Sequence, residues 1–143
     1  MTGRRGITRS AIDVERVLSS VWDDSAGGTV LFVGTVRNKS ETKKVRGLEY
    51  EVYRDMAERK MLEIEEKARS RWAVKKIVTV HRTGKLRVGD VSVAVAVSAE
   101  HRREAFEACR FVIDSIKRTA PIWKRELHQN GEQAWVKGSP IED

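Results

Sequence analysis

Two short runs of β-branched and small apolar residues constrain the fold of this chain more than any other feature. They are KKIVTVHR at residues 75–82 and VSVAVAVS at residues 91–98, and both have the composition of strands. The segment between them, TGKLRVGD, contains Gly84 and Gly89. Glycine is the residue that adopts turn conformations most freely. These segments therefore predict two strands joined by a turn.

Three further segments have the periodicity of helices. Apolar residues recur three and four positions apart at 11–22, 54–72 and 99–119. The third helix must end before Pro121, because proline cannot continue a helix and restricts the residue before it. Its apolar face includes Cys109, the single cysteine of the chain. A lone cysteine cannot form an internal disulfide, and we expect Cys109 to be a core residue.

Other runs predict the remaining strands. The sequence TVLFVGTVR at 29–37 is rich in β-branched residues, and RGLEYEVY at 46–53 alternates between apolar and polar positions. A hairpin is expected over 122–136, where the pair Asn130-Gly131 is a strong turn signal. The lysine-rich segment 38–44 has no periodicity and is expected to be a mobile loop. This order of helices and hairpins predicts an α+β fold with a largely antiparallel sheet.

Length and charge narrow the class of protein. The 143 residues contain no long linker, so we expect one domain spanning 1–143, with flexible ends at 1–10 and 138–143. No apolar run is long enough for a membrane span and the N-terminus does not read as a secretory signal, which predicts a cytoplasmic protein. The formal net charge of +7 predicts attraction to anions such as nucleic acid, a phosphorylated metabolite or an acidic protein.

Basic residues at the ends of the predicted elements are candidates for binding an anion. Arg37 follows a strand where the chain enters the lysine-rich loop, and His101 and Arg102 open the third helix. A helix N-terminus attracts negative charge, so basic residues there favour a bound phosphate or carboxylate. The structural alternative for each side chain is a solvated surface charge. Metal binding is not expected, because His81, His101 and His128 lie in separate elements without further ligands at suitable spacing.

The segment IDSIKRTAPIWKRE, residues 113–126, places one lysine on each side of its proline. Lys117 comes before Pro121 and Lys124 follows it. A lysine in the last turn of a helix stabilises the helix dipole by about 0.3–1 kcal/mol, which accounts for Lys117 on structural grounds alone. Lys124 lies beyond the helix, next to Trp123, and that explanation does not apply to it. Two lysines that converge on one site would supply a proton donor or a nucleophile.

Five motifs of the chain resemble those of a known family, the large, catalytic subunits of molybdopterin synthase (the MoaE family). The motifs occur in the family's order and at about its spacing, and the resemblance extends from residue 28 to residue 137. They are FVGTVRNKS, LEYEVYRDMAERKM, VHRTGKLRVGD, SAEHRREAFEACRFVIDSIKRTAPIWKRE and GEQAWV. The N-terminal ten residues do not align, and the tail after Trp135 is shorter than in many relatives.

This resemblance implies a fold, a reaction and partners. The fold would be of the α/β hammerhead type with about three helices, and the protein would be a homodimer that binds one small subunit at each end, a heterotetramer. The reaction converts cyclic pyranopterin monophosphate into molybdopterin by installing two sulfurs as a dithiolene, in molybdenum cofactor biosynthesis. The sulfur comes from a small ubiquitin-like carrier whose C-terminal glycine is a thiocarboxylate. No metal or other cofactor is expected in this sulfurtransferase.

The resemblance also assigns site residues. The catalytic lysines of the family match Lys117 and Lys124. The remaining substrate-binding positions match three groups in this chain: Thr35, Val36 and Arg37; His101 and Arg102; and Arg125 and Glu126. Cationic donors of this kind suit a cyclic phosphate.

Two alternatives belong to other classes of protein. A basic nucleic-acid-binding module is compatible with the net charge, but it needs exposed aromatic residues among the basic ones. Aromatic residues make up 6% of the chain, and Phe32 and Phe106 are at positions expected to face the core. The second alternative is a non-catalytic scaffold that keeps the partner-binding surface. The presence of both Lys117 and Lys124 argues against a scaffold.

Overall fold

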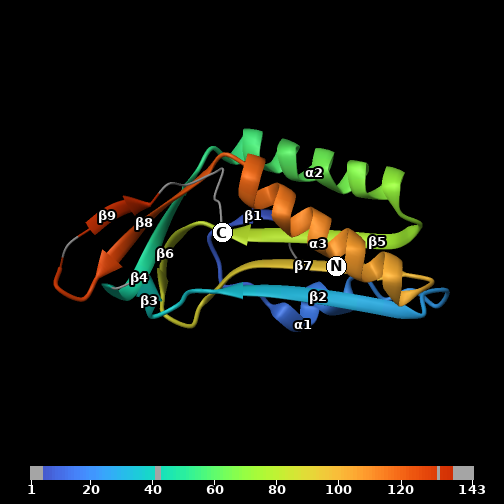
Figure 1. The fold of residues 1–143 in the computed structure, drawn as a ribbon, viewed down its shortest axis with the longest axis horizontal. Helices are drawn as coiled ribbons and strands as arrows, with labels where there is room; N and C mark the ends of the chain where they lie inside the picture. Colours follow the sequence, from blue (N-terminus) through green and yellow to red (C-terminus); the bar gives the residue numbers. More distant parts are fainter. Residues whose placement is uncertain (1–4, 41–42, 132, 137–143) are drawn as a thin grey trace.

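The computed structural model describes residues 5–40, 43–131 and 133–136, which form three helices and nine strands (Figure 1). In chain order the elements are β1 Gly6–Thr8, α1 Val14–Ser19, β2 Gly28–Thr35, β3 Lys39–Ser40, β4 Lys43–Val52, α2 Arg54–Arg71, β5 Val74–Arg82, β6 Gly84–Arg87, β7 Val91–Ala99, α3 Arg102–Thr119, β8 Ile122–His128 and β9 Gln133–Val136.

The first sheet has four strands in the order β1-β5-β7-β2. The central strand β7 pairs antiparallel with both β5 and β2, whereas β1 pairs parallel with β5. Because β7 is covered on both faces, its alternating side chains enter two separate apolar clusters. Val93, Val95 and Val97 face one cluster, and Ala94 and Ala96 face the other. This double burial explains why the strand consists almost entirely of valine and alanine.

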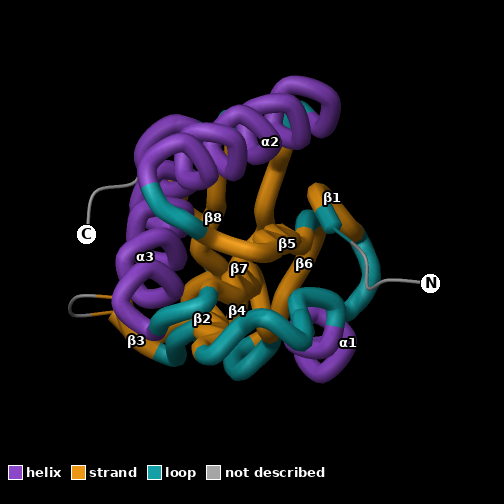
Figure 2. The backbone as a smooth tube through the Cα atoms, turned by 90° about the vertical axis from the view of Figure 1, so that its right-hand side faces the viewer, coloured by secondary structure: helices purple, strands orange, loops and turns teal. Residues whose placement is uncertain are grey.

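Helices cover the two faces of this sheet unequally. Figure 2 shows α2 and α3 on one side of the strands and the short α1 on the other. The cluster under α2 and α3 is the larger one and includes Met61, Ile64, Val112 and Ile116. The cluster under α1 contains Val17 and other small aliphatic residues. The main core therefore lies beneath the two long helices, and α3 ends where this core meets the second sheet.

The second sheet joins β3, β4, β8 and β9 in that order, and β6 pairs with β4. All of these pairs are antiparallel. The chain leaves β5, adds β6 to the second sheet and returns as β7, so Gly84 and Gly89 mark the two crossings between sheets. Both have positive φ, 95° and 91°, where a side chain would be strained. The two sheets are therefore linked directly, and the site described below lies at their junction.

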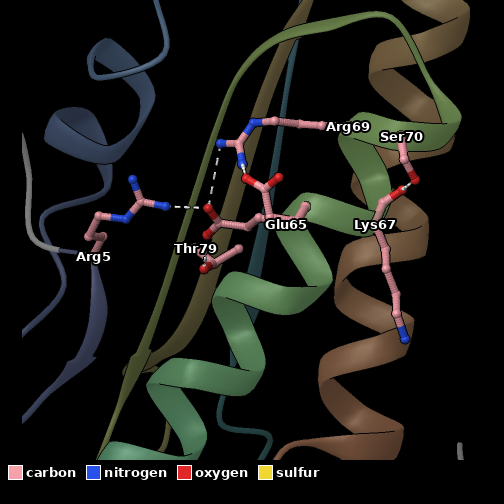
Figure 3. Close-up of polar contacts among 7 residues, drawn as sticks. Arg5, Glu65, Lys67, Arg69, Ser70 and Thr79 are labelled. Carbon is pink, nitrogen blue, oxygen red and sulfur yellow. Dashed lines mark hydrogen bonds and ion pairs between the residues drawn. The ribbon is translucent and has the colours of Figure 1, made fainter.

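Two carboxylates of α2 hold the N-terminal strand β1 in place, and one of them also contacts β5. Glu65 is 1% exposed, accepts a hydrogen bond from the Thr79 hydroxyl at 2.6 Å and forms ion pairs with Arg5 and Arg69 (Figure 3). The backbone N–H of Ile7 donates to a Glu58 carboxylate oxygen at 2.9 Å. A buried carboxylate requires such partners. These contacts fix β1 beside β5.

The architecture confirms the predicted α+β class with a mostly antiparallel sheet and three helices. The strands expected at 75–82 and 91–98 are β5 and β7, and the hairpin over 122–136 is β8–β9 with Gly131 at a φ of 87°. The expected core role of Cys109 is also confirmed, since the residue is 3% exposed.

Several details differ from the expectations. Three short strands were missed: β1 in the segment expected as a flexible end, β3 in the expected loop, and β6 in the expected turn. Residues 1–4 of the N-terminal end, 41–42 of that loop and 138–143 of the C-terminal end lie outside the described residues. The first helix begins only at Val14, because the Asp13 side chain caps it by accepting from the Arg16 N–H at 3.2 Å. Phe106 does not face the core: it is 61% exposed.

Candidate functional site

Lys117 and Lys124 lie on two consecutive elements, α3 and β8, which are joined at Ala120 and Pro121. Lys117 is in the last turn of α3, which ends with Ala120 in an extended conformation, φ −74° and ψ 138°. The chain then enters β8, where Lys124 is paired with Tyr50 of β4. Both lysine side chains are partly buried. The proline stop thus brings the end of the helix and the start of the strand to one place, as the sequence predicted.

His81, near the end of β5, joins this group. The residue is 7% exposed, and its ring lies 4.9 Å from the Tyr50 ring in an edge-to-face arrangement. Burial lowers the pKa of His81 to about 4, and the positive charges of Lys117 and Lys124 act in the same direction. Both lysines are therefore within electrostatic reach of one buried imidazole. The sequence indicates for His81 only a metal-ligand role, which its spacing rules out, and does not predict its place beside the lysines.

The protonation state of His81 follows from its hydrogen bond. Its Nδ1 lies 2.8 Å from the backbone carbonyl oxygen of Arg82. A carbonyl can only accept, so Nδ1 carries the proton. The neutral ring therefore has an unprotonated Nε2 with a free lone pair for a donor.

Tyr50 connects this cluster to the end of β2. Burial raises the pKa of Tyr50, and its hydroxyl shares a hydrogen bond with Ser92. The Ser92 hydroxyl also donates to the carbonyl oxygen of Gly34 at 3.2 Å. The register of β2 against β7 shifts between Gly34 and Thr35. Tyr50 thus contacts His81 through its ring and reaches the irregular end of β2 through Ser92.

The predicted residues Thr35, Val36 and Arg37 lie at this end of β2. Thr35 and Arg37 are exposed, whereas Val36 is buried in the main core. The Val36 N–H donates to the Asp90 carbonyl at 3.0 Å, and its carbonyl accepts from Gly89 at 2.9 Å. Val36 therefore anchors the strand end, while Thr35 and Arg37 present their side chains to solvent.

Glu126 lies on the same face of β8 as Lys124, two residues further along. It accepts a hydrogen bond from His128 Nε2 at 3.0 Å. Burial raises the pKa of Glu126, but hydrogen bonds from Ser40 and His128 and the charges of His128 and Lys124 outweigh this effect, and the pKa is lowered. Glu126 is thus a carboxylate that ties the β3 hairpin to the lysine-bearing strand.

Arg125 points to the opposite face of β8 from Lys124. It forms an ion pair with Glu49, and its guanidinium lies 5.0 Å from the centre of the Trp135 ring. An open cavity of about 310 Å³ on this side is lined by Glu51, Val52, Tyr53, Trp123 and Trp135. Neither lysine lines this cavity, so it is separate from the lysine site, and Arg125 supports the sheet rather than the lysines.

His101 and Arg102 lie at the other end of α3. His101 is the N-cap residue, and both side chains are exposed. At a rise of about 1.5 Å per residue, the helix separates His101 from Lys117 by roughly 24 Å. Figure 1 shows α3 running along the whole first sheet between these two ends. A single copy of the chain therefore does not bring His101 and Arg102 to the lysines.

Close packing fixes this helix start. A side chain at Gly28 would approach the Arg102 Cα to 3.0 Å, and one at Gly27 would lie 2.5 Å from the Glu100 carbonyl oxygen. The two glycines allow the start of β2 to sit against the first turn of α3. His101 Nε2 lies 3.5 Å from the Glu100 carboxylate, so the exposed pair has a carboxylate beside it.

The described residues also bear on metal sites and on membrane-spanning helices. No group of three or more His, Cys, Asp or Glu side chains there is arranged to hold a metal ion. Within the same residues, none of the helices has the length and apolar character needed to span a bilayer.

The titration of His81 gives a prediction for stability. The imidazole of His81 has a pKa near 6.5 in the unfolded chain and near 4 in the folded chain. Between these values the unfolded chain binds a proton that the folded chain does not, so acid favours unfolding. We expect the free energy of unfolding to fall by about 3 kcal/mol on this account as the pH drops from 6.5 to 4. Urea titrations of the wild type and of His81→Asn measure it. His81→Asn should lose this part of the pH dependence, whereas His101→Asn, at an exposed position, should keep it. If the free energy of unfolding falls with pH equally steeply in the wild type and in His81→Asn, the prediction is wrong.

Fold and site together define an α+β enzyme that presents two lysines from a helix end and the next strand at the junction of two sheets. Residues 7–119 match the model of the MoaE protein family, and the chain belongs to this family. Several molybdopterin synthase catalytic subunits are similar to this chain. The catalytic subunit from Nostoc sp. is 44% identical over 131 residues, which cover 91% of this chain and 79% of the relative. The one from Pyrococcus abyssi is 41% identical over 126 residues, covering 88% and 84%.

Solved structures agree with this assignment. The molybdopterin synthase structure from Staphylococcus aureus superposes with a TM-score of 0.87 at 33% identity, covering 92% of this chain and 96% of that one. A chain in a complex of subunits 1 and 2 of molybdopterin-converting factor from Helicobacter pylori 26695 has a TM-score of 0.77 at 24% identity, covering 95% and 93%. At 24% identity, the similarity to the Helicobacter pylori chain supports only the fold.

Proposed function

We propose that this protein converts cyclic pyranopterin monophosphate into molybdopterin by accepting two sulfurs from a thiocarboxylated carrier protein. The observation that carries the proposal is the position of Lys117 in the last turn of α3 and of Lys124 in β8, the element that follows it. The charges of both lysines also lower the pKa of the buried His81. Relatives named as molybdopterin synthase catalytic subunits support the same reaction. The substrate carries a phosphate, which suits a site built from cationic side chains.

The two lysines act where sulfur is delivered. At each delivery a carbon–sulfur bond forms at a substrate carbon while a carbon–oxygen bond of that carbon breaks and its oxygen leaves. The bond between sulfur and the carrier's terminal acyl carbon breaks as well, and water adds to that acyl carbon to give a carboxylate. Ammonium groups beside the reacting atoms stabilise the oxyanion of the tetrahedral intermediate and supply or take up protons. No metal or other cofactor takes part in this proposal, since the carrier supplies the sulfur.

Two of the other predicted residues have roles beside the lysines in this proposal. Arg37 at the end of β2 lies on the side of the first sheet where α3 ends, and it supplies a bidentate donor for phosphate. Glu126 holds the β3 hairpin against β8 beside Lys124. In this role Glu126 shapes the wall of the site, while Arg37 and the lysines contact the anionic substrate.

A second copy of the chain completes the site. His101 and Arg102 are too far from the lysines of their own chain, separated by roughly 24 Å along α3. A two-fold symmetric dimer places the same surface of both copies in contact, so the α3 start of one protomer can face the lysine site of the other. The proposed homodimer thus gives His101 and Arg102 access to the substrate phosphate.

The sulfur donor is proposed to be a small ubiquitin-like subunit that carries a C-terminal thiocarboxylate. One such subunit at each end of the dimer makes a heterotetramer, and we place the reaction in the cytoplasm. The relative from Helicobacter pylori was solved as a complex of two subunits, which supports an assembly of this kind. A thiocarboxylate is an anion, so the cationic site attracts the carrier's terminus as well as the substrate.

The test is a reconstituted reaction. Purified protein is incubated with cyclic pyranopterin monophosphate and the thiocarboxylated carrier, and molybdopterin is detected as its fluorescent oxidation product. Product should form in proportion to carrier consumed. The same carrier with an ordinary carboxylate at its terminus is the control and should give none. Absence of product together with salt-dependent binding of an oligonucleotide would instead favour the nucleic-acid alternative.

A further inference from the structure

A buried histidine–carboxylate pair lies on the strand that carries Lys124. Glu126 and His128 of β8 are 8% and 4% exposed, and Nε2 of His128 lies 3.0 Å from a carboxylate oxygen of Glu126. Side chains two positions apart on a strand point to the same face of the sheet, with their Cα atoms about 6.6 Å apart. Lys124, Glu126 and His128 therefore form one row on β8, and the carboxylate lies in the middle of it.

The chemistry of the pair defines where the proton lies. An ionised carboxylate can only accept, so Nε2 of His128 donates to Glu126. Burial acts to raise the pKa of Glu126, yet hydrogen bonds from Ser40 and His128 stabilise its carboxylate and the pKa is lowered. The other ring nitrogen of His128, Nδ1, is buried and has no hydrogen-bond partner within residues 5–40, 43–131 and 133–136. In the part of the chain that the structure describes, the polar contact of this imidazole is therefore the one to Glu126.

The backbone beneath this pair is fixed, so the side-chain torsions are the freedom that remains to Glu126. In the pairing of β8 with β4, Glu126 is opposite Leu48 and His128 is opposite Val45, and both partners are buried core residues. The hydrogen bond from His128 removes that remaining freedom. Two apolar side chains are often at least as stabilising at buried positions as a polar pair, because charged groups lose their hydration on burial. The pair therefore indicates a role for an oriented carboxylate at this place.

We propose that His128 is a positioning residue for substrate binding: its Nε2–H holds the Glu126 carboxylate beside Lys124, where the carboxylate accepts hydrogen bonds from N–H groups of the pterin ring. Lysine and arginine side chains can only donate, which suits the phosphate but not a ring that presents donors. Glu126 supplies the acceptor that these cations lack. The identity of the ligand rests on the proposed function, whereas the contact between His128 and Glu126 does not.

Nuclear magnetic resonance tests the contact without any substrate. The chain has three histidines, so the ring resonances of His128 can be assigned by substituting His81 and His101 in turn. We expect Nε2 to carry the proton, and this proton to resonate far downfield because its acceptor is charged. In Glu126→Gln a neutral amide oxygen replaces the carboxylate, and the resonance should move upfield. A proton on Nδ1 alone, or an unchanged Nε2–H resonance in Glu126→Gln, overturns the proposal.

Binding of cyclic pyranopterin monophosphate in the absence of the carrier tests the role. Calorimetry then measures Kd without turnover, and inorganic phosphate is the control ligand because it has no ring. The side chain of His128→Asn is too short to bring its amide to Glu126, whereas His128→Gln can place an N–H near the Nε2 position. We expect His128→Asn to weaken binding of the pterin roughly tenfold, as for the loss of a hydrogen bond to a charged group, and to leave phosphate binding unchanged. His128→Gln should retain most of the affinity.

Removal of the carboxylate separates positioning from a general structural effect. Glu126→Ala should weaken pterin binding at least as much as His128→Asn, and the double variant should bind no more weakly than Glu126→Ala, because His128 acts through the carboxylate. Circular dichroism checks the fold of each variant. If His128→Asn does not fold, the comparison of Glu126→Ala with the double variant decides, since neither contains a carboxylate that has lost its donor.

Three results overturn the proposal: wild-type pterin affinity in His128→Asn, an equal loss of phosphate affinity in that variant, or additive effects of the two substitutions. Failure of the proposed function looks different. In that case the wild type itself does not bind the pterin, and the magnetic resonance measurement still decides whether His128 holds Glu126.

Discussion

We expect Lys117→Ala to abolish formation of the dithiolene product and to leave the dimer folded. The side chain is at the end of a helix and only partly buried, so its removal leaves the apolar face of α3 intact. Removing one group that stabilises a developing oxyanion typically lowers kcat by about 10²–10³-fold, and the loss of a proton donor adds to this effect. The measurement is the initial rate of molybdopterin formation with excess thiocarboxylated carrier. Lys124→Ala should have a comparable effect.

Arg118→Ala is the matched control for this loss. Arg118 is adjacent to Lys117 on the same helix turn and carries the same charge, but it is exposed. Its substitution should leave the rate within about twofold of wild type, because exposed surface charges contribute little. Circular dichroism and size-exclusion chromatography should show the same fold and dimer for all three variants. Normal product yield from Lys117→Ala would show that the assignment of this lysine is wrong.

We expect two inactive variants to regain activity when they are combined in one dimer. Lys117→Ala lacks a reacting group, and Arg102→Ala lacks a phosphate contact that we assign to the opposite protomer. In a mixed dimer one of the two sites receives both substituted residues, and the other receives an intact Lys117 and an intact Arg102. Co-expression with two affinity tags, followed by purification through both, isolates the mixed dimer. It should show about half of the wild-type rate, since one of its two sites is intact.

The arrangement of the two substitutions provides the control for this experiment. A mixed dimer of wild type and the double variant Arg102→Ala, Lys117→Ala has one substitution in each site, so both of its sites are defective. It should therefore be nearly inactive, although it contains the same substitutions in total. If His101 and Arg102 served the lysines of their own chain, the two results would be reversed. Only the composite site predicts activity for the first combination and its loss in the second.

The long elements of the fold were predictable because their patterns are local. The strands β5 and β7 are recognisable from their valine-rich composition, and α3 from its apolar spacing and the proline that follows it. The short strands β1, β3 and β6 carry no periodic signal of their own. They form because a long strand offers a free edge: β5 accepts β1, and β4 accepts both β3 and β6. Such pairing depends on tertiary contacts that single segments do not encode.

The proximity of the two lysines was predictable from the sequence, whereas the positions of the three histidine and arginine residues discussed here were not. Lys117 and Lys124 are seven positions apart around Pro121, so their proximity could be read from the chain. His81 lies far from both in sequence, and only the junction of the two sheets brings it to them. His101 and Arg102 matched the family's binding positions, yet the length of α3 separates them from the lysines. The exposed Phe106 was misjudged because a position beside an apolar stripe can still face outward.

The burial of Cys109 restricts the route that sulfur can take. This residue is the chain's single cysteine, it is 3% exposed, and its Sγ lies 3.7 Å from the Val95 carbonyl oxygen within the core. Burial raises the pKa of its thiol to about 11, so the reactive thiolate is scarce at neutral pH. A persulfide relay on this subunit would require an accessible thiolate. We therefore expect sulfur to pass from the donor to the pterin without a persulfide on Cys109, so the protein should keep its activity after treatment with thiol-alkylating reagents.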